Sequence, residues 1–393
     1  MSRGILTINA GSSSIKFALY ELAHPVSAHA EVSGQIDGIG TGTTRMKADD
    51  RAGERIADQT LAGEKVSHAQ AFDALLKWFT QNYANWEIVA VGHRVVHGGE
   101  RYSQPTVIDT QVLDDLVSFI PLAPLHEPHN VAGIRALQEL LPAIPQVACF
   151  DTAFHRAQPG VAQMFGLPRS VSAEGIKRYG FHGLSYEYIA RALPQHSRRA
   201  NGRVVVAHLG NGASMAAMVD RKCVATTLGF STIDGLMMGT RCGNLDPGVV
   251  LHLMETKGLS VKDMTRMLYK ESGLLGVSGI SQDMRTLLAS DKPEAQEAVD
   301  LFCYRIVREL GSLTAAAGGL DALVFTGGIG EHAAEIRRRV CLQSEWLGIR
   351  LDAEANARHD IHIGAGNSSV DVLVIPTNEE WMMAHHAQTL LGL

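Results

Sequence analysis

The sequence predicts an α/β fold built from two duplicated domains. Its 393 residues exceed one average domain, so two domains, each with its own core, are expected. Expected strands and helices alternate along most of the chain, which is typical of an α/β fold. A strand, a polar glycine turn and a second strand occur at residues 8–14 and again at 208–214. This repeat indicates a duplicated unit with two facing turns, although strand–glycine–strand hairpins are common.

The first half opens with a predicted β-meander, formed by β-rich stretches at 4–10, 14–21 and 28–36. The Gly-, Thr- and Asp-rich residues 38–53 are interpreted as an exposed connection. Periodicity then predicts alternating elements. They are helices at 68–83, 111–120 and 131–141, and strands at 88–91 and 146–150.

The second half begins a new cycle with a strand at Arg203 that runs into the second glycine turn. Helices are expected after Asp246 and at 261–271 and 293–317, and strands at 322–325 and 370–375. Thr377 and Glu380 have the spacing of a capping box, which predicts the start of a closing helix and leaves Glu379 free.

Charge and composition argue against several classes of protein. A net charge of −6 disfavours broad nucleic-acid binding, and the basic run at 337–339 is interpreted as the solvated face of a helix. The start shows no basic leader with an apolar signal core, and no stretch approaches a membrane span, so a cytoplasmic protein without a membrane partner is expected. The five cysteines form no C-x-x-C pair, and only Cys242, beside Arg241, is a candidate reactive thiol.

Three glycine turns at strand ends could hold phosphate groups. They lie at 11–14, 210–214 and 327–330, and their backbone N–H groups can approach phosphate oxygens because glycine has no Cβ. Each alone is better explained as a tight strand turn, but three together, each at the carboxyl end of a strand, favour a nucleotide. None matches a P-loop or a complete dinucleotide-binding motif. Lys16 could reach the transferred phosphate, or it is an ordinary solvated residue of a strand.

Two oxygen-bearing side chains could hold a magnesium ion. Asn9 lies near the end of the first predicted strand and Glu379 near the start of the last predicted helix, and Mg²⁺ prefers a few such oxygens together with water and phosphate. The alternative for Glu379 is a favourable interaction with the helix dipole. The pairs His126/His129 and His93/His97 lack convincing further ligands for zinc.

Positively charged and donor groups suit a carboxylate and a phosphoryl group in transfer. Arg94 follows a buried strand, where it could grip a carboxylate with two hydrogen bonds, and Val96 supplies apolar surface nearby. Arg241 lies in a polar glycine loop, and His182 lies between glycines and aromatic residues. A structural ion pair for Arg94 and a structural role for His182 are the alternatives.

The motifs INAGSSSIKF, GHRVVHGGE, PLAPLH, FDTAFH, RYGFHG, HLGNGAS, MGTRCGNLDPG, FTGGIGE and IPTNEE occur in this order along nearly the whole chain. Together they resemble the acetate kinase family of short-chain acyl kinases, within the acetate and sugar kinase/heat-shock chaperone/actin superfamily. The resemblance implies ribonuclease-H-like domains at 1–150, joined by a helix at 377–393, and at 151–376, with ATP in a cleft between them and usually a homodimer. The implied reaction is reversible phosphorylation of acetate to acetyl phosphate.

The resemblance also implies roles residue by residue. Asn9 and Glu379 would bind Mg²⁺, and Arg94 would bind the acid, with Val96 and Leu125 in the expected acyl pocket. Asp151, His182 and Arg241 would be catalytic. The residues implied for ATP are Lys16, His208, Leu209, Gly210, Asn211, Gly212, Asp283, Met284, Arg285, Gly327, Gly328, Ile329, Gly330 and Glu331.

Acid–base chemistry refines the role of Asp151. The attacking carboxylate, with an ordinary pKa near about 4, has no proton to remove at neutral pH. We therefore expect Asp151 to orient Arg94, Arg241 or a magnesium-bound water.

Three departures from the family pattern are Asn244, His332 and the run Glu127-Pro128-His129, which stands where Asn-Pro-Pro is common. The last lies near the expected acyl pocket and leaves the chain length of the acid open, so a propionate kinase is the alternative. An ATP-driven chaperone or an actin-like protein is a remote one.

Overall fold

The chain forms two compact units. The computed structural model describes residues 1–63 and 65–393. Unit 1 comprises Met1–Ala153 with Asn378–Leu393, and unit 2 comprises Phe154–Thr377. Unit 1 is therefore completed by a segment that follows unit 2 in the sequence.

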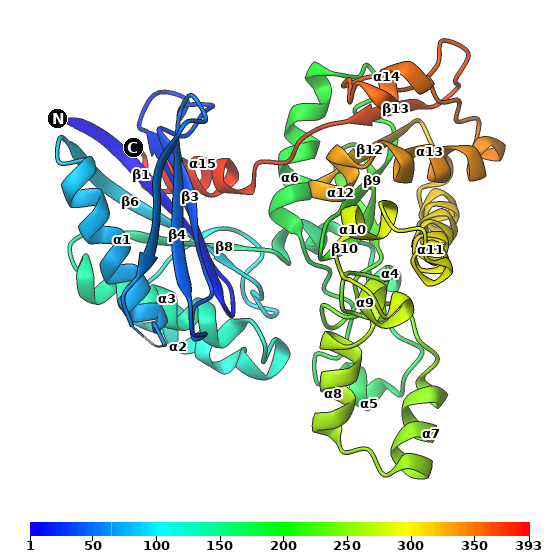
Figure 1. Ribbon diagram of the computed structural model, residues 1–393, viewed down its shortest axis with the longest axis horizontal. Coiled ribbons are helices and arrows are strands. Elements are labelled where there is room, and N and C mark those ends of the chain that lie inside the picture. The colour runs from blue at the N-terminus through cyan, green and yellow to red at the C-terminus, as the bar shows by residue number, and fades with distance from the viewer. Residues whose placement is uncertain (64) are drawn as a thin grey trace. The chain divides into compact units, whose positions relative to one another are not determined.

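Unit 1 is built on an eight-stranded sheet with the order β5-β4-β3-β2-β1-β6-β8-β7 (Figure 1). The central strand β1 pairs antiparallel with β2 and parallel with β6, and β6 pairs parallel with β8. The strands are β1 (Ser2–Ala10), β2 (Ser14–Glu21), β3 (Val32–Asp37), β4 (Thr44–Asp50), β5 (Arg55–Leu61), β6 (Trp86–Val95), β7 (Thr106–Val107) and β8 (Gln146–Phe150).

Helices cover both faces of this sheet. The helices are α1 (His68–Asn82), α2 (Thr110–Ser118), α3 (Glu127–Leu140) and α15 (Glu379–Leu391). On one face, the apolar residues Leu6 and Ile8 of β1 join a core with Phe72 of α1 and Leu137 of α3. On the other face α15 packs closely, since a Cβ on Gly92 of β6 would lie 3.0 Å from a backbone oxygen of α15.

Strand alternation decides which side chains face α15. Successive residues of a strand point to opposite faces, so Asn9 points away from the core that holds Ile8. Lys16 of β2 lies directly opposite Asn9 and shares its face. Arg94 has the same parity as Gly92 and also lies on this face. The polar candidates of unit 1 therefore gather on the side of the sheet that α15 covers.

Unit 2 repeats the central part of this topology. Its five strands have the order β11-β10-β9-β12-β13, which matches β3-β2-β1-β6-β8 in order and in parallel or antiparallel pairing. The strands are β9 (Arg203–Leu209), β10 (Ala213–Val219), β11 (Lys222–Thr226), β12 (Ala322–Thr326) and β13 (Asp371–Val374). The predicted α/β fold with a duplicated unit is confirmed.

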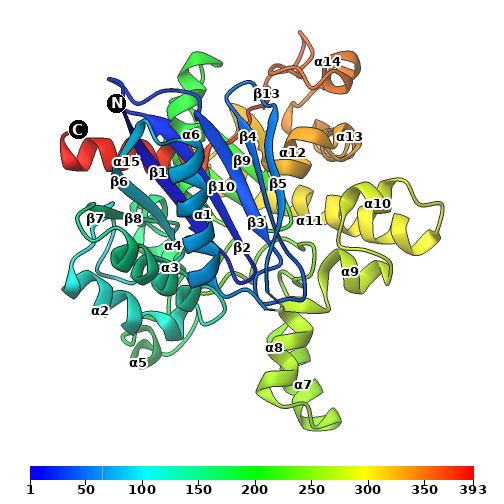
Figure 2. The same cartoon turned by 60° about the vertical axis from the view of Figure 1, so that its left-hand side comes forward.

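The sheet of unit 2 also has helices on both faces, with α6 on one and α11 on the other (Figure 1). A pair of helices, α7 and α8, projects away from this sheet (Figure 2). The helices of the unit are α4 (Gly160–Gln163), α5 (Arg169–Ser172), α6 (Gly183–Ala192), α7 (Pro247–Lys257), α8 (Val261–Lys270), α9 (Gly273–Ser278), α10 (Met284–Leu288), α11 (Pro293–Ala317), α12 (Gly327–His332), α13 (Ala334–Gln343) and α14 (Ala353–Ala357).

Three sequence interpretations are wrong in detail. Residues 38–53 are not simply an exposed connection, because they contain β4, whose Met46 and Ala48 are fully buried. The last helix is capped by Asn378, whose side chain accepts a hydrogen bond from the backbone N–H of Trp381 at 2.8 Å. Thr377 makes no such bond, so the expected capping box does not form. Arg337 is fully buried, unlike the solvated face expected for the run at 337–339.

Within the described parts of the chain, no helix is both long enough and apolar enough to span a membrane.

Candidate active site

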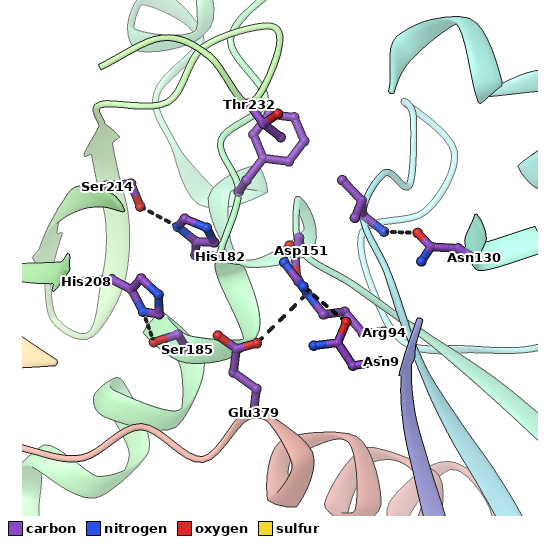
Figure 3. A network of polar contacts seen from close by, with 12 residues as sticks. Asn9, Arg94, Asn130, Asp151, His182, Ser185, His208, Ser214, Thr232 and Glu379 are labelled. Carbon is purple, nitrogen blue, oxygen red and sulfur yellow. Dashed lines mark hydrogen bonds and ion pairs between the residues drawn. The ribbon is translucent and has the colours of Figure 1, made fainter. Parts of the chain in front are cut away.

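Arg94 is the centre of a charged network in unit 1 (Figure 3). Its Nε and Nη2 donate to the two carboxylate oxygens of Asp151, at 2.9 and 2.5 Å, and Nη1 donates to Asn9 Oδ1 at 3.2 Å. Nε also lies 3.9 Å from Oε2 of Glu379. The four residues come from the ends of β1, β6 and β8 and the start of α15, so parallel strand ends and one helix start bring them together.

The electrostatics of this network depend on burial. Burial by itself lowers the pKa of Arg94, but the charge and hydrogen bonds of Asp151 outweigh it and raise that pKa. Burial raises the pKa of Glu379 to about 7, although Arg94 opposes the shift. The side chain of Asp151 is only 1% exposed. An arginine must therefore stay beside it, because an unpaired carboxylate there would be costly.

The expected acyl pocket begins beside the network. Val96 is buried and Leu125 is half-buried. Asn130 of α3 ties this region to the sheet, because its Oδ1 accepts from the backbone N–H of Val96 at 3.0 Å and its Nδ2 donates to the carbonyl of Ala10 at 2.9 Å. Asn130 was missed in the sequence, where an amide inside a helix carries no distinguishing signal.

Unit 2 carries a second network made of histidines and hydroxyl groups (Figure 3). His182 Nδ1 lies 2.9 Å from Ser214 Oγ, and His208 Nδ1 lies 2.8 Å from Ser185 Oγ. The two imidazole rings are stacked with their centroids 4.5 Å apart. His182 has a left-handed backbone (φ 57°) immediately before α6, which turns its ring toward the end of β9 and the start of β10.

The second glycine turn lies against His182 and Arg241. A Cβ built on Gly212 would lie 3.3 Å from His182 Nε2 and 3.9 Å from Arg241 Nη1, so two nitrogen-bearing side chains converge on this turn. Arg241 is held in place by a 2.9 Å hydrogen bond from its Nη1 to the carbonyl of Thr232. Gly239 in the same loop donates to the carbonyl of Asn211 at 3.0 Å.

The third glycine turn is also fixed within unit 2. Gly327 has φ 76°, a conformation that glycine adopts without strain, and its N–H donates to Glu331 Oε1 at 2.8 Å. Arg337 donates to the carbonyls of Gly330 and Glu331, at 2.9 and 2.8 Å, and so fastens the far end of α12. Sequence reasoning missed Arg337 because a basic run normally faces solvent.

The remaining nucleotide candidates lie at the start of α10. Asp283 caps this helix and pairs with Arg285, whose side chain is 91% exposed. The hydrogen bond from Arg285 lowers the pKa of Asp283 to about 2. Met284 is buried, and Leu209 is fully buried at the end of β9, so these two support the turns through packing.

The surroundings of two further candidates, Lys16 and Cys242, bear on their roles. Lys16 is exposed and contributes to the electrostatic environment of Glu379. Burial raises the pKa of the Cys242 thiol, so the reactive thiolate considered for this position is not supported. In the described residues no cluster of three or more His, Cys, Asp or Glu side chains could hold a metal ion.

Comparison with known proteins gives consistent full-length matches. Residues 4–385 match the Acetokinase family. The chain is 55% identical to an acetate kinase of Rhodopseudomonas palustris, covering 99% of both chains. Among solved structures, a propionate kinase of Francisella tularensis superposes with a TM-score of 0.91 at 37% identity, covering 98% of this chain and 99% of that one. An acetate kinase of Porphyromonas gingivalis gives 0.88 at 37% identity, covering 99% and 100%.

Proposed function

This chain belongs to the acetokinase family and is a kinase, and we propose that it transfers the γ-phosphoryl group of ATP reversibly to acetate, forming acetyl phosphate. The observation that carries the proposal is the Arg94–Asp151 pair beside Val96. It offers a fixed guanidinium next to apolar surface, and a small carboxylic acid has one polar and one apolar end to match.

The geometry of the pair suggests how the acid is bound. Asp151 occupies the Nε and Nη2 side of the guanidinium, and Asn9 takes one hydrogen of Nη1. Donors of Nη1 and Nη2 remain on the other edge, where a substrate carboxylate can accept two hydrogen bonds. In this proposal Asp151 acts as an orienting residue, because a carboxylate substrate has no proton for a base to remove.

Unit 2 contributes donors for the phosphoryl group. We propose that His182 Nε2 and Arg241 stabilise the charge that spreads over the phosphoryl oxygens in the transition state. The bond between Nδ1 and Ser214 orients the ring, and both side chains reach the turn at Gly212. We propose that ATP is held by two glycine turns, at 210–212 and 327–331, together with residues 283–285 and Lys16.

The magnesium ion expected with ATP finds suitable donors in unit 1. Asn9 Oδ1 and Glu379 Oε2 both lie around the Arg94 guanidinium, so an amide and a carboxylate oxygen are close together. These hard oxygen ligands are of the kind that Mg²⁺ uses together with phosphate and water. When bound, the ion would neutralise charge on the phosphate oxygens.

Propionate is the alternative acid. It is favoured by the similarity to the Francisella tularensis propionate kinase. One methylene group changes binding by only about 1–3 kcal/mol, so the two acids are expected to compete. The acyl phosphate can be trapped with hydroxylamine while acetate, propionate or butyrate is supplied. The kcat/KM values for the three acids then show which of them the enzyme prefers. The proposed function is wrong if a folded protein with MgATP yields no hydroxamate from any of the three acids.

We propose that the protein is a homodimer that acts in the cytoplasm, where ATP is available. Helix α7 supports the dimer because none of its residues is buried although it is rich in apolar side chains. Leu251 is 66% exposed, and Val261 at the start of α8 is 71% exposed. An apolar surface of this kind is typical of a protein interface. Sedimentation of the wild-type protein and of Leu251→Asp tests this: the substitution should shift the dimer to a monomer.

A further inference from the structure

Glu127, the first residue of α3, is a buried carboxyl group that the proposed mechanism does not use. It is completely shielded from solvent, and neither of its oxygens has a hydrogen-bond partner among the described residues. An isolated carboxylate in such a place is far more costly than a neutral carboxylic acid. Its surroundings therefore favour the protonated form.

The position of Glu127 places it at the acid site. Asn130 lies one turn further along α3, and residues separated by three positions share a helix face. On that face, Asn130 bonds to the backbone of Val96 and of Ala10. Glu127 therefore points to the strand ends where Val96 and the Arg94–Asp151 pair are found. The backbone N–H of His97, next to Val96, is near enough to favour the ionised form of Glu127, although it falls short of hydrogen-bond geometry.

The charges around Glu127 reinforce its neutral state. Burial, reinforced by repulsion from Asp151, raises the pKa of Glu127 to about 8, although the nearby backbone N–H of His97 opposes the shift. Burial also lowers the pKa of the His97 imidazole to about 4, so that ring stays neutral. The elements packed against α3 are α1, α2, β1 and β6. Besides Asp151 after β8, the other titratable groups on α3, at its cap and on these elements are His126, His129, Arg135, Glu139, His68, Asp73, Lys77, Asp114, Asp115, Arg3, Glu87, His93 and Arg94.

We propose that Glu127 is a positioning residue of the acid site that acts in its protonated form, supporting the segment at Val96 without adding a negative charge. This inference rests on the proposed function. When Glu127 ionises, a second buried carboxylate appears beside Asp151, where it opposes the binding of a carboxylate substrate. Arg94 is already paired with Asp151, so it does not offset this second charge.

A pH profile of acid binding tests the proposal. The KM for acetate of the wild-type enzyme should rise about tenfold between pH 7 and pH 9, because only the form with protonated Glu127 binds the acid well. In Glu127→Gln, which keeps the shape and cannot ionise, the KM should stay flat over this range with kcat near the wild-type value at pH 7. Glu139→Gln, at an exposed position of the same helix, should keep the wild-type slope. The KM for MgATP should vary with pH equally in all three proteins.

Three outcomes would overturn the proposal. The first is a wild-type KM for acetate that does not change up to pH 9, a measurement that needs no variant. The second is a folded Glu127→Gln protein whose KM for acetate rises with pH as in the wild type, and the third is one that no longer binds the acid at pH 7. If hydroxamate still forms in these cases, only the role of Glu127 is refuted and the proposed acyl kinase function stands. If no short acid gives a product at any pH, the proposed function itself is refuted. If Glu127→Gln does not fold, Glu127→Asn is measured in the same way. A KM for acetate that rises with pH in this variant as it does in the wild type would also contradict the proposal.

Discussion

The two units use the same sheet order for different chemistry. In unit 1 the ends of β1, β6 and β8 carry charged groups, with Arg94, Asp151 and Asn9 in contact. In unit 2 the ends of β9 and β10 carry imidazole and hydroxyl groups, with His182 bonded to Ser214. Asn9 and His208 occupy equivalent places in the first strand of each hairpin. A duplicated fold thus preserves the positions of side chains while their chemistry diverges.

The largest effect is expected for Arg94→Ala, which breaks the charged network of unit 1. The kcat/KM for acetate should fall by about 10³-fold or more, because the substrate loses its partner and Asp151 is left as an unpaired buried carboxylate. Arg94→Lys should recover little of this, since a point charge cannot replace the two-edged guanidinium. The hydroxamate assay measures the loss, with circular dichroism as a check of folding. Arg135→Ala, at an exposed position of α3, should remain near the wild type.

Asp151→Asn tests whether Asp151 orients Arg94 or removes a proton as a general base. The amide nitrogen would face the donors of Arg94, so we expect kcat/KM to fall by about 100-fold, equivalent to the loss of a charge-assisted hydrogen bond. This loss should be the same across the pH profile. Full recovery of activity at high pH would instead identify Asp151 as a general base.

His182→Ala tests the network of histidines and hydroxyl groups in unit 2. We expect kcat to fall by about 10²-fold while the KM for acetate changes only a few-fold, because the ring is proposed to act on the transition state. Ser214→Ala, which removes only the orienting bond, should lower kcat by about 3–10-fold. Equal losses in KM for the two variants would show that unit 2 also determines acid binding.

Arg337→Met tests what fixes the third glycine turn. The buried guanidinium donates to Gly330, Glu331 and Asn356, so its loss should lower the free energy of unfolding by about 2–4 kcal/mol. Arg338→Met is the matched control: it removes an exposed pair with Glu335 and should cost at most about 0.5 kcal/mol. Urea unfolding separates them, and similar values for both would contradict the structural role of Arg337.

The smallest effect is expected at the start of α15. Asn378→Ala removes the cap and should lower the free energy of unfolding by about 1 kcal/mol. Thr377→Val removes a buried hydroxyl that has no hydrogen-bond partner among the described residues and should be close to neutral. Thermal unfolding measures the stability of both variants. A larger loss of stability in Thr377→Val than in Asn378→Ala would indicate that Thr377 caps the helix.

Regular patterns and motif order made most of the fold predictable. The boundaries of α11 and β8 follow directly from apolar periodicity. The strand β4 was missed because its glycine- and aspartate-rich flanks resemble a loop, whereas its burial depends on distant partners in α1. Arg337 and Glu127 escaped for the same reason: burial of a charged residue is set by tertiary packing and leaves no local pattern.

The placement of α15 in unit 1 has a consequence for synthesis on the ribosome. Domains that are continuous in sequence can fold as soon as they emerge, but unit 1 must wait until unit 2 has been translated before α15 covers its sheet. Until then the face that carries Asn9 and Arg94 lacks both its helix and Glu379. Nascent chains are therefore expected to expose this face to chaperones, and to gain the Glu379 carboxylate, the proposed magnesium ligand, only after unit 2 has been translated.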